Sequence, residues 1–124
     1  MKIQKLIEAL LILISIVSGC SSFTLEPRAW TKSEKTAALF YITAHTADAI
    51  TTENILNRPG FSEANPLMGS HPSDTEIGTY FALTGVITIT IAHFNPDYRK
   101  HILYGYGGVN AFCAASNYNN IRQD

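Results

Sequence analysis

The hydrophobic positions of this chain fall into four segments that are separated by polar breaks. The first is a short apolar run near the N-terminus, from 9 to 17. The other three are longer, and residues that favour helix starts precede each of them. This pattern predicts an all-α fold, with an N-terminal signal helix followed by a three-helix bundle. We expect the last two helices of the bundle to form an apolar antiparallel hairpin.

Start and stop signals bound the predicted helices. A capping box at Thr31–Glu34 opens the first helix of the bundle, and the Asn57–Gly60 break ends it after about Leu56. A second capping box, Ser73–Glu76, opens the next helix, which should reach about His93.

The last helix should follow a short turn. Asn95 can serve as its N-cap and Pro96 as its first helical residue. We expect it to end at Ser116 or Asn117, before a polar tail at 119–124.

The middle helix also carries a strand signal, because Val86–Ile91 alternates and is rich in β-branched residues. Its length and its capping box favour a helix instead. Small residues recur every three or four positions on this helix and on the next, so we expect the two small-residue faces to meet closely. They are Gly78, Ala82 and Gly85 on the one, and Gly105, Gly108 and Ala111 on the other.

The N-terminal segment has the plan of a secretory signal: Lys2 and Lys5 precede an apolar run that is short for a membrane span. The residues Val17–Cys20 that follow resemble the lipobox of bacterial lipoproteins. That resemblance implies cleavage before Cys20 and attachment of fatty acyl chains, such as palmitate, to its thiol. Ser21 is not the aspartate of the enterobacterial inner-membrane sorting rule, which implies an outer-membrane location in a Gram-negative host.

Cleavage at this point predicts four regions. They are a lipoprotein signal peptide at 1–19, a tether at 20–30, a helical membrane-associated domain at 31–118 and a polar tail at 119–124. Lipidation of Cys20 leaves Cys113 without a disulfide partner, so we expect it to pack as a small hydrophobe.

The charge composition indicates which classes of partner the chain is suited to bind. The chain has 124 residues, 9 basic and 10 acidic, and a net charge of −1. With neither a basic patch nor a charge run, it does not have the electrostatic pattern of a nucleic-acid binder.

Two stretches, 77–96 and 101–121, contain no Asp, Glu, Lys or Arg, and each is close to the ~20 residues that cross a bilayer. Gly, Thr, Asn and Tyr dilute both. Two interpretations stay open: helices embedded in the membrane, which the lack of charge favours, and a bundle that lies against the membrane. An uncleaved multi-pass protein of the inner membrane is the alternative localisation.

Polar residues within this apolar framework form the candidate site. The first bundle helix carries a stripe at helical spacing, and the loop that follows adds further polar groups. The predicted cluster is His45, Asp48, Thr52, Glu63, Asn65 and His71, beside Tyr41 on the same stripe.

Two hypotheses compete for this cluster. His and carboxylate side chains at this spacing can hold a divalent metal or do acid–base chemistry. Alternatively, Asp48 accepts hydrogen bonds from backbone amides or from Asn65 in a buried network, because unpaired charge is costly in apolar surroundings. No established metal, nucleophile or phosphate motif is present. We therefore expect a structural network with no metal, cofactor or catalytic residue.

Part of the cluster also carries a resemblance. Asp48-Ala-Ile-Thr51, followed by Glu63-Ala-Asn65-Pro66, resembles a D-x-x-T…E-x-N-P signature in small uncharacterised bacterial and phage membrane proteins. The likeness spans about 30–118 and implies three or four helices. The group has no established activity, so the resemblance implies topology rather than chemistry.

These observations together predict a lipid-anchored bacterial or phage-encoded envelope protein with a structural or interaction role at the membrane. Its partners would be membrane lipid, through acylated Cys20, and an envelope protein or a second copy of the chain. The alternative is a small membrane enzyme or metal-binding protein that uses the Asp48 and Glu63 region.

Overall fold

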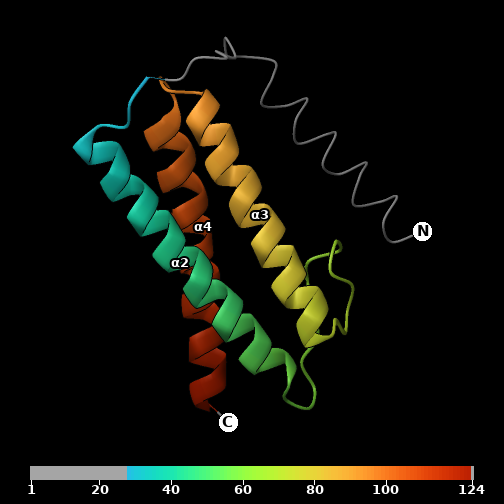
Figure 1. Cartoon of the computed structure of the whole chain (residues 1–124). Coiled ribbons are helices and arrows are strands. Elements are labelled where there is room, and N and C mark those ends of the chain that lie inside the picture. The colour runs from blue at the N-terminus through green and yellow to red at the C-terminus, as the bar shows by residue number, and fades with distance from the viewer. Residues whose placement is uncertain (1–27, 124) are drawn as a thin grey trace.

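The computed structural model describes residues 28–123, where three α-helices form a packed bundle (Figure 1). They are α2 (Lys32–Leu56), α3 (Asp74–Phe94) and α4 (Arg99–Gln123). The all-α prediction is therefore confirmed, and the segment with the strand signal is helical. The predicted signal peptide, its lipobox and most of the tether lie outside the described residues.

Both predicted capping boxes form. The Thr31 hydroxyl accepts from the Glu34 amide, while the Thr31 amide donates to the Glu34 carboxylate at 2.8 Å. The same reciprocal pair joins Ser73 and Glu76, with the Ser73 amide 2.9 Å from the carboxylate. Local side-chain chemistry thus places the starts of α2 and α3 at the predicted residues.

The prediction that Asn95 caps the last helix is wrong. Its side-chain amide instead donates to the Ile91 carbonyl at 2.7 Å, so Asn95 closes the end of α3. Residues 96–98 form a turn, and α4 begins at Arg99. The Oδ1 of Asn95, the atom that an N-cap would use, is buried and accepts no hydrogen bond from the amides of α4.

The end of α4 also differs from the prediction, because the helix runs through the expected polar tail to Gln123. Contacts with α2 and with the residues after it explain this. The Asn117 amide donates to the Thr52 hydroxyl at 3.1 Å, and Arg58 donates to the Ile121 carbonyl at 3.0 Å. These bonds dock the last turns of α4, which the sequence pattern shows only as polar.

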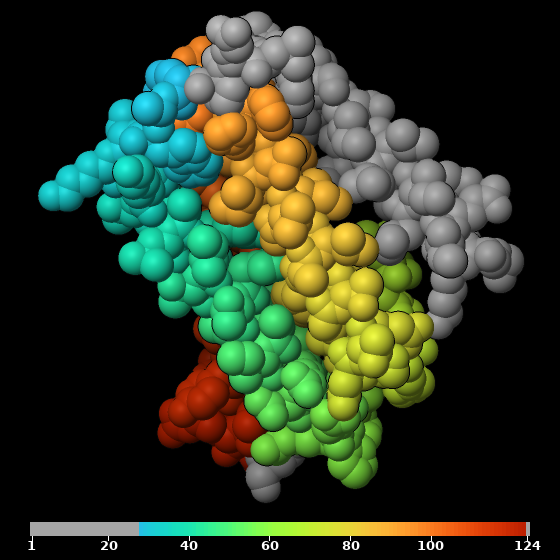
Figure 2. All heavy atoms as spheres, in the orientation of Figure 1, coloured from blue at the N-terminus to red at the C-terminus, as the bar shows by residue number. Residues whose placement is uncertain are grey.

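α2 is the central helix of the bundle and packs mainly on α4, whereas α3 and α4 touch little. Figure 1 shows α3 and α4 joined by their turn at one end, antiparallel, and diverging towards the other. Space-filling atoms show the α2 surface running along α3 across this face (Figure 2).

The predicted small-residue contact within the α3–α4 hairpin is wrong. A Cβ built on Gly78, Gly105 or Gly108 would have no neighbour within 4 Å among the residues described. The close approach occurs at Gly107, where a Cβ would lie 3.2 Å from the Cα of Tyr41 on α2. Gly85 of α3 also faces α2 rather than α4. The small residues therefore serve contacts with α2, the helix that the local pattern did not implicate.

The bundle leaves much apolar surface uncovered. Its buried core consists of two small clusters, one around Tyr41 and Leu103 and one around Met68, Ile77 and Phe81. In the part of the chain that the structure describes, α3 is the one helix with the length and composition to cross a membrane, and 22% of its most apolar window is buried. Large apolar side chains on all three helices are exposed, among them Leu39, Ile42 and Ile50 of α2, Leu83 and Val86 of α3, and Val109 and Phe112 of α4.

Candidate functional site

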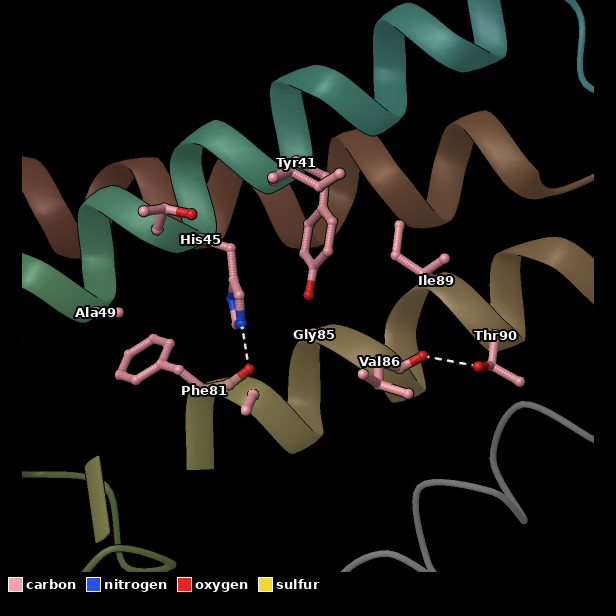
Figure 3. A pocket seen from close by; sticks show the side chains of 11 residues that line it. Tyr41, His45, Ala49, Phe81, Gly85, Val86, Ile89 and Thr90 are labelled. Atoms are coloured by element: carbon pink, nitrogen blue, oxygen red, sulfur yellow. Dashed lines mark hydrogen bonds between the residues drawn. The ribbon is translucent and has the colours of Figure 1, made fainter. Parts of the chain in front are cut away.

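All three helices meet at His45. Its Nε2 lies 2.8 Å from the Phe81 carbonyl of α3 (Figure 3), and its Nδ1 lies 3.1 Å from Oδ1 of Asn110 on α4. The Asn110 amide nitrogen donates to the Tyr106 carbonyl at 2.7 Å, which turns Oδ1 towards the imidazole. Both partners of the ring are therefore acceptors. A neutral ring donates to one of them, and a doubly protonated ring donates to both.

His45 also packs tightly within this junction. Its ring stacks on Tyr41, with centroids 5.2 Å apart, and lies against Gly85, where a Cβ would be 3.3 Å from Nε2. A shallow groove of about 520 Å³ lies between α2 and α3 here, and Figure 3 shows the labelled side chains of both helices that line it.

A larger cleft of about 720 Å³ lies between the three helices and the loop that joins α2 to α3. His45, Asp48 and Thr52 line it from α2, and Glu63 and Asn65 line it from the loop. The structure thus brings five of the six predicted cluster residues to one cavity. His71 is exposed and does not line it. It lies near the end of the loop, with Pro72 and Ser73 between it and the start of α3.

Asp48 is the buried acid of this cleft, with 8% of its surface exposed. Its Oδ1 accepts from the Thr52 hydroxyl at 3.4 Å, which is a long hydrogen bond. Burial raises the pKa of Asp48 to about 6, an effect that Thr52 and His45 partly oppose. The neutral carboxyl is favoured because few groups in the cleft replace its hydration.

The loop does not supply the bond to Asp48 that we expected. Asn65 instead accepts from the Leu67 amide at 3.0 Å, and Glu63 accepts from the Asn65 amide at 2.7 Å. These short-range bonds shape the loop itself, because each acceptor finds an amide two residues along the chain. The network is therefore split into an α2–α4 part and a loop part.

A second polar cluster, at the opposite end of the bundle, was not predicted. Arg99 is fully buried, and its guanidinium donates to the carboxylate of Glu34 at 3.1 Å and to the carbonyls of Ala92 and His93 at 3.1 and 3.0 Å. Arg28 adds a two-bond pair to Glu34, at 2.6 and 2.9 Å. The spacing of 65 residues between Glu34 and Arg99 carries no local signal of this pairing.

The segment before α2 is held against this cluster. Arg28 donates to the Pro96 carbonyl at 3.1 Å, and the Trp30 ring lies 4.3 Å below the Arg99 guanidinium. The Trp30 indole also donates to Nδ1 of His93 at 3.1 Å. Hydrogen bonds from Arg28, Thr31 and Arg99 hold the pKa of Glu34 well below its usual range.

In residues 28–123 no three His, Cys, Asp or Glu side chains converge as the ligands of a metal ion would. Comparison with protein-family models, with curated proteins and with solved structures finds no match for this chain. The resemblance to small bacterial and phage membrane proteins stays a prediction, and function has to be argued from geometry.

Proposed function

We propose that the chain is a lipid-anchored envelope protein, acylated at Cys20, whose helical bundle acts through contacts at the membrane. The observation that supports this most is the distribution of charge along the bundle. The end of the bundle at which α2 begins carries five basic and two acidic side chains. They are Arg28, Lys32, Lys35, Arg99 and Lys100 against Glu34 and Asp97.

The far end of the bundle has the opposite balance, with two basic and four acidic side chains. They are Arg58 and Arg122 against Glu53, Glu63, Asp74 and Glu76. Glu34 and Arg99 neutralise each other, so the near end exposes mainly lysines. Such a surface attracts the anionic headgroups of bacterial phospholipids.

The short segment between Cys20 and Arg28 limits how far the basic end of the bundle can lie from the lipid anchor. Arg28 is bonded to Glu34 and Pro96, and it lies eight positions after Cys20 in the sequence. A fully extended chain of that length spans at most ~28 Å. Acylation of Cys20 would therefore keep the basic end of the bundle close to the headgroups. Trp30 and Tyr98 lie at the same end, where aromatic side chains suit the membrane–water interface.

The sides of the bundle support the interaction role. An exposed apolar face runs along α3 through Leu83 and Val86, and another runs along α4 through Val109 and Phe112. A small monomer in water rarely keeps so much apolar surface uncovered. We propose that these faces contact lipid, an envelope protein or a second copy, with α3 as the helix best suited to membrane contact.

The first test is chemical. Intact mass of the protein isolated from its native membrane should show loss of residues 1–19 and addition of acyl chains, and Cys20→Ser should remain an unprocessed, unlabelled precursor. A Cys20→Ser protein that is processed and localised like the parent would exclude the lipoprotein assignment.

The second test concerns orientation. Trp30 is the chain's one tryptophan, so its fluorescence reports on the basic end alone. The acylated protein in vesicles that contain brominated anionic phospholipids should show strong quenching of Trp30. Quenching no greater than that of a water-soluble tryptophan control would mean that this end points away from the membrane.

A further inference from the structure

We infer that the cleft between α2, α3, α4 and their loop binds a small organic cation, with an aromatic or apolar body and a protonated amine that pairs with Asp48. This site is independent of the lipid anchor and would be present whether or not the bundle is tethered.

The dimensions of the cleft suit a small molecule. Its volume of about 720 Å³ lies within the range of ~300–1,000 Å³ that is usual for ligand sites. Aromatic side chains line it from the loop, from α3 and from α4. They are Phe61, Tyr80, Phe81, Tyr106 and Phe112. Phe112 is 75% exposed and Val109 is 63% exposed although both line the cleft, so the fold leaves apolar surface uncovered at its edge.

The acidic side chains that line the cleft favour a positively charged ligand. Asp48 and Glu63 line it, and no Lys or Arg of the described residues does. Asp48 is more than nine-tenths buried, with the long bond to Thr52 as its hydrogen bond. A buried carboxylate is costly without a charged partner, and an ammonium group would supply one.

The ionisable neighbours of Asp48 do not supply a direct ion pair. His45 partly offsets the burial of the carboxylate, but its two ring nitrogens bond to the Phe81 carbonyl and to Asn110, so neither is directed at Asp48. Glu63 from the loop, Tyr80 from α3 and Cys113 from α4 also interact electrostatically with the carboxylate, and none of them carries positive charge. Tyr80 and Tyr106 would add the ring faces that attract an alkylammonium.

Three probes that share an indole ring and differ in charge test the proposal. They are tryptamine, neutral tryptophol and anionic indole-3-propionate. The full chain in uncharged detergent micelles should bind one tryptamine by calorimetry at pH 8, after subtraction of empty micelles. We expect tryptophol to bind at least tenfold more weakly and the acid to show no binding. Equal affinity for the three probes, or no binding of tryptamine, would overturn the proposal.

Asp48→Asn is the decisive variant, because it removes the charge and keeps the shape. Tryptamine affinity should fall at least tenfold, and the parent should lose affinity as the pH drops from 8 to 5 and Asp48 takes up a proton. Asp97→Asn, exposed in the turn at the other end of the bundle, is the matched control and should bind like the parent. Equal affinities in the two variants would reject Asp48 as the counter-ion.

Alkylation of Cys113 gives an assay on the parent protein, so it requires no substituted variant to fold. It is a free, half-buried cysteine in the wall of the same cleft. Saturating tryptamine should slow its alkylation by iodoacetamide at least threefold, measured on the Cys113 peptide by mass spectrometry, and tryptophol should not. Alkylation at an unchanged rate would place tryptamine outside the cleft and overturn the proposal.

Discussion

The guanidinium of Arg99 donates to the carboxylate of Glu34 at 3.1 Å, and both side chains are buried. This ion pair joins the first turn of α4 to the first turn of α2. Glu34 also completes the capping box of α2, so one carboxylate serves helix initiation and tertiary packing together. The pair therefore couples the start of α2 to the position of α4.

Glu34→Gln should test this coupling. The substitution leaves Arg99 buried without its counter-ion, and we expect the free energy of unfolding to fall by about 3 kcal/mol at neutral pH. Chemical denaturation followed by circular dichroism measures it. Glu53→Gln, at an exposed site on the same helix, should change stability by less than about 0.5 kcal/mol. Similar losses in both variants would argue against a special role for the ion pair.

The same pair predicts acid sensitivity. Because Arg28, Thr31 and Arg99 lower the pKa of Glu34 in the folded protein, its stabilisation is fully present above the ordinary glutamate value of 4.5 and is lost as the pH falls below it. Glu34→Gln should therefore lose less stability than the parent between pH 5 and pH 2. Parallel pH profiles would contradict this prediction.

Asp48 should have the opposite pH dependence. Burial raises its folded pKa from 3.8 to about 6, so its contribution is greatest below the lower value and is lost as the pH rises through about 6. Asp48→Asn keeps an acceptor for Thr52 and never ionises. At pH 8 it should be more stable than the parent by about 1–2 kcal/mol, since one pKa unit is worth about 1.4 kcal/mol and the cleft retains some water. The difference should vanish near pH 4, which denaturation at both pH values would show.

Adjacent glycines on α4 offer a matched pair. A Cβ at Gly107 would lie 2.7 Å from the Phe40 ring and 3.2 Å from the Tyr41 Cα, whereas Gly108 has nothing within 4 Å among the described residues. Gly107→Leu should therefore destabilise the fold by about 1–3 kcal/mol through overpacking. Gly108→Leu should be neutral or slightly stabilising, because leucine favours helix more than glycine does. Thermal unfolding of the two variants would separate them, and the reverse order would place the close contact elsewhere.

His45 should matter more to stability than His71. His45→Leu removes hydrogen bonds to both α3 and α4 and leaves their acceptors in a partly buried setting, which should cost about 1–3 kcal/mol. His71→Leu changes an exposed loop residue and should be nearly neutral. In the parent, added zinc should leave the unfolding temperature unchanged. A zinc-dependent rise that is lost in His45→Leu would instead favour a metal site.

The features that the sequence by itself determined are those that depend on interactions between residues close together in the chain. The helices starting at Lys32 and Asp74 follow from reciprocal bonds between residues three apart, and the Asn57–Gly60 break ends the first of them. Helical spacing also placed His45, Asp48 and Thr52 on one face of α2. Each of these features rests on neighbours within one or two turns, so each is visible in the sequence.

Tertiary structure decided the rest, because it depends on which distant groups meet. The sequence pattern pointed to Gly108 for a close helix contact, whereas the position of α2 places that contact at the adjacent Gly107. The sequence alone predicts a polar tail at the end of α4, whereas in the structure this part is helical and Asn117 donates a hydrogen bond to Thr52 of α2. The sequence gives no sign that Arg99 is buried. Its burial is possible because Glu34, far away in the chain, supplies the carboxylate that pairs with it.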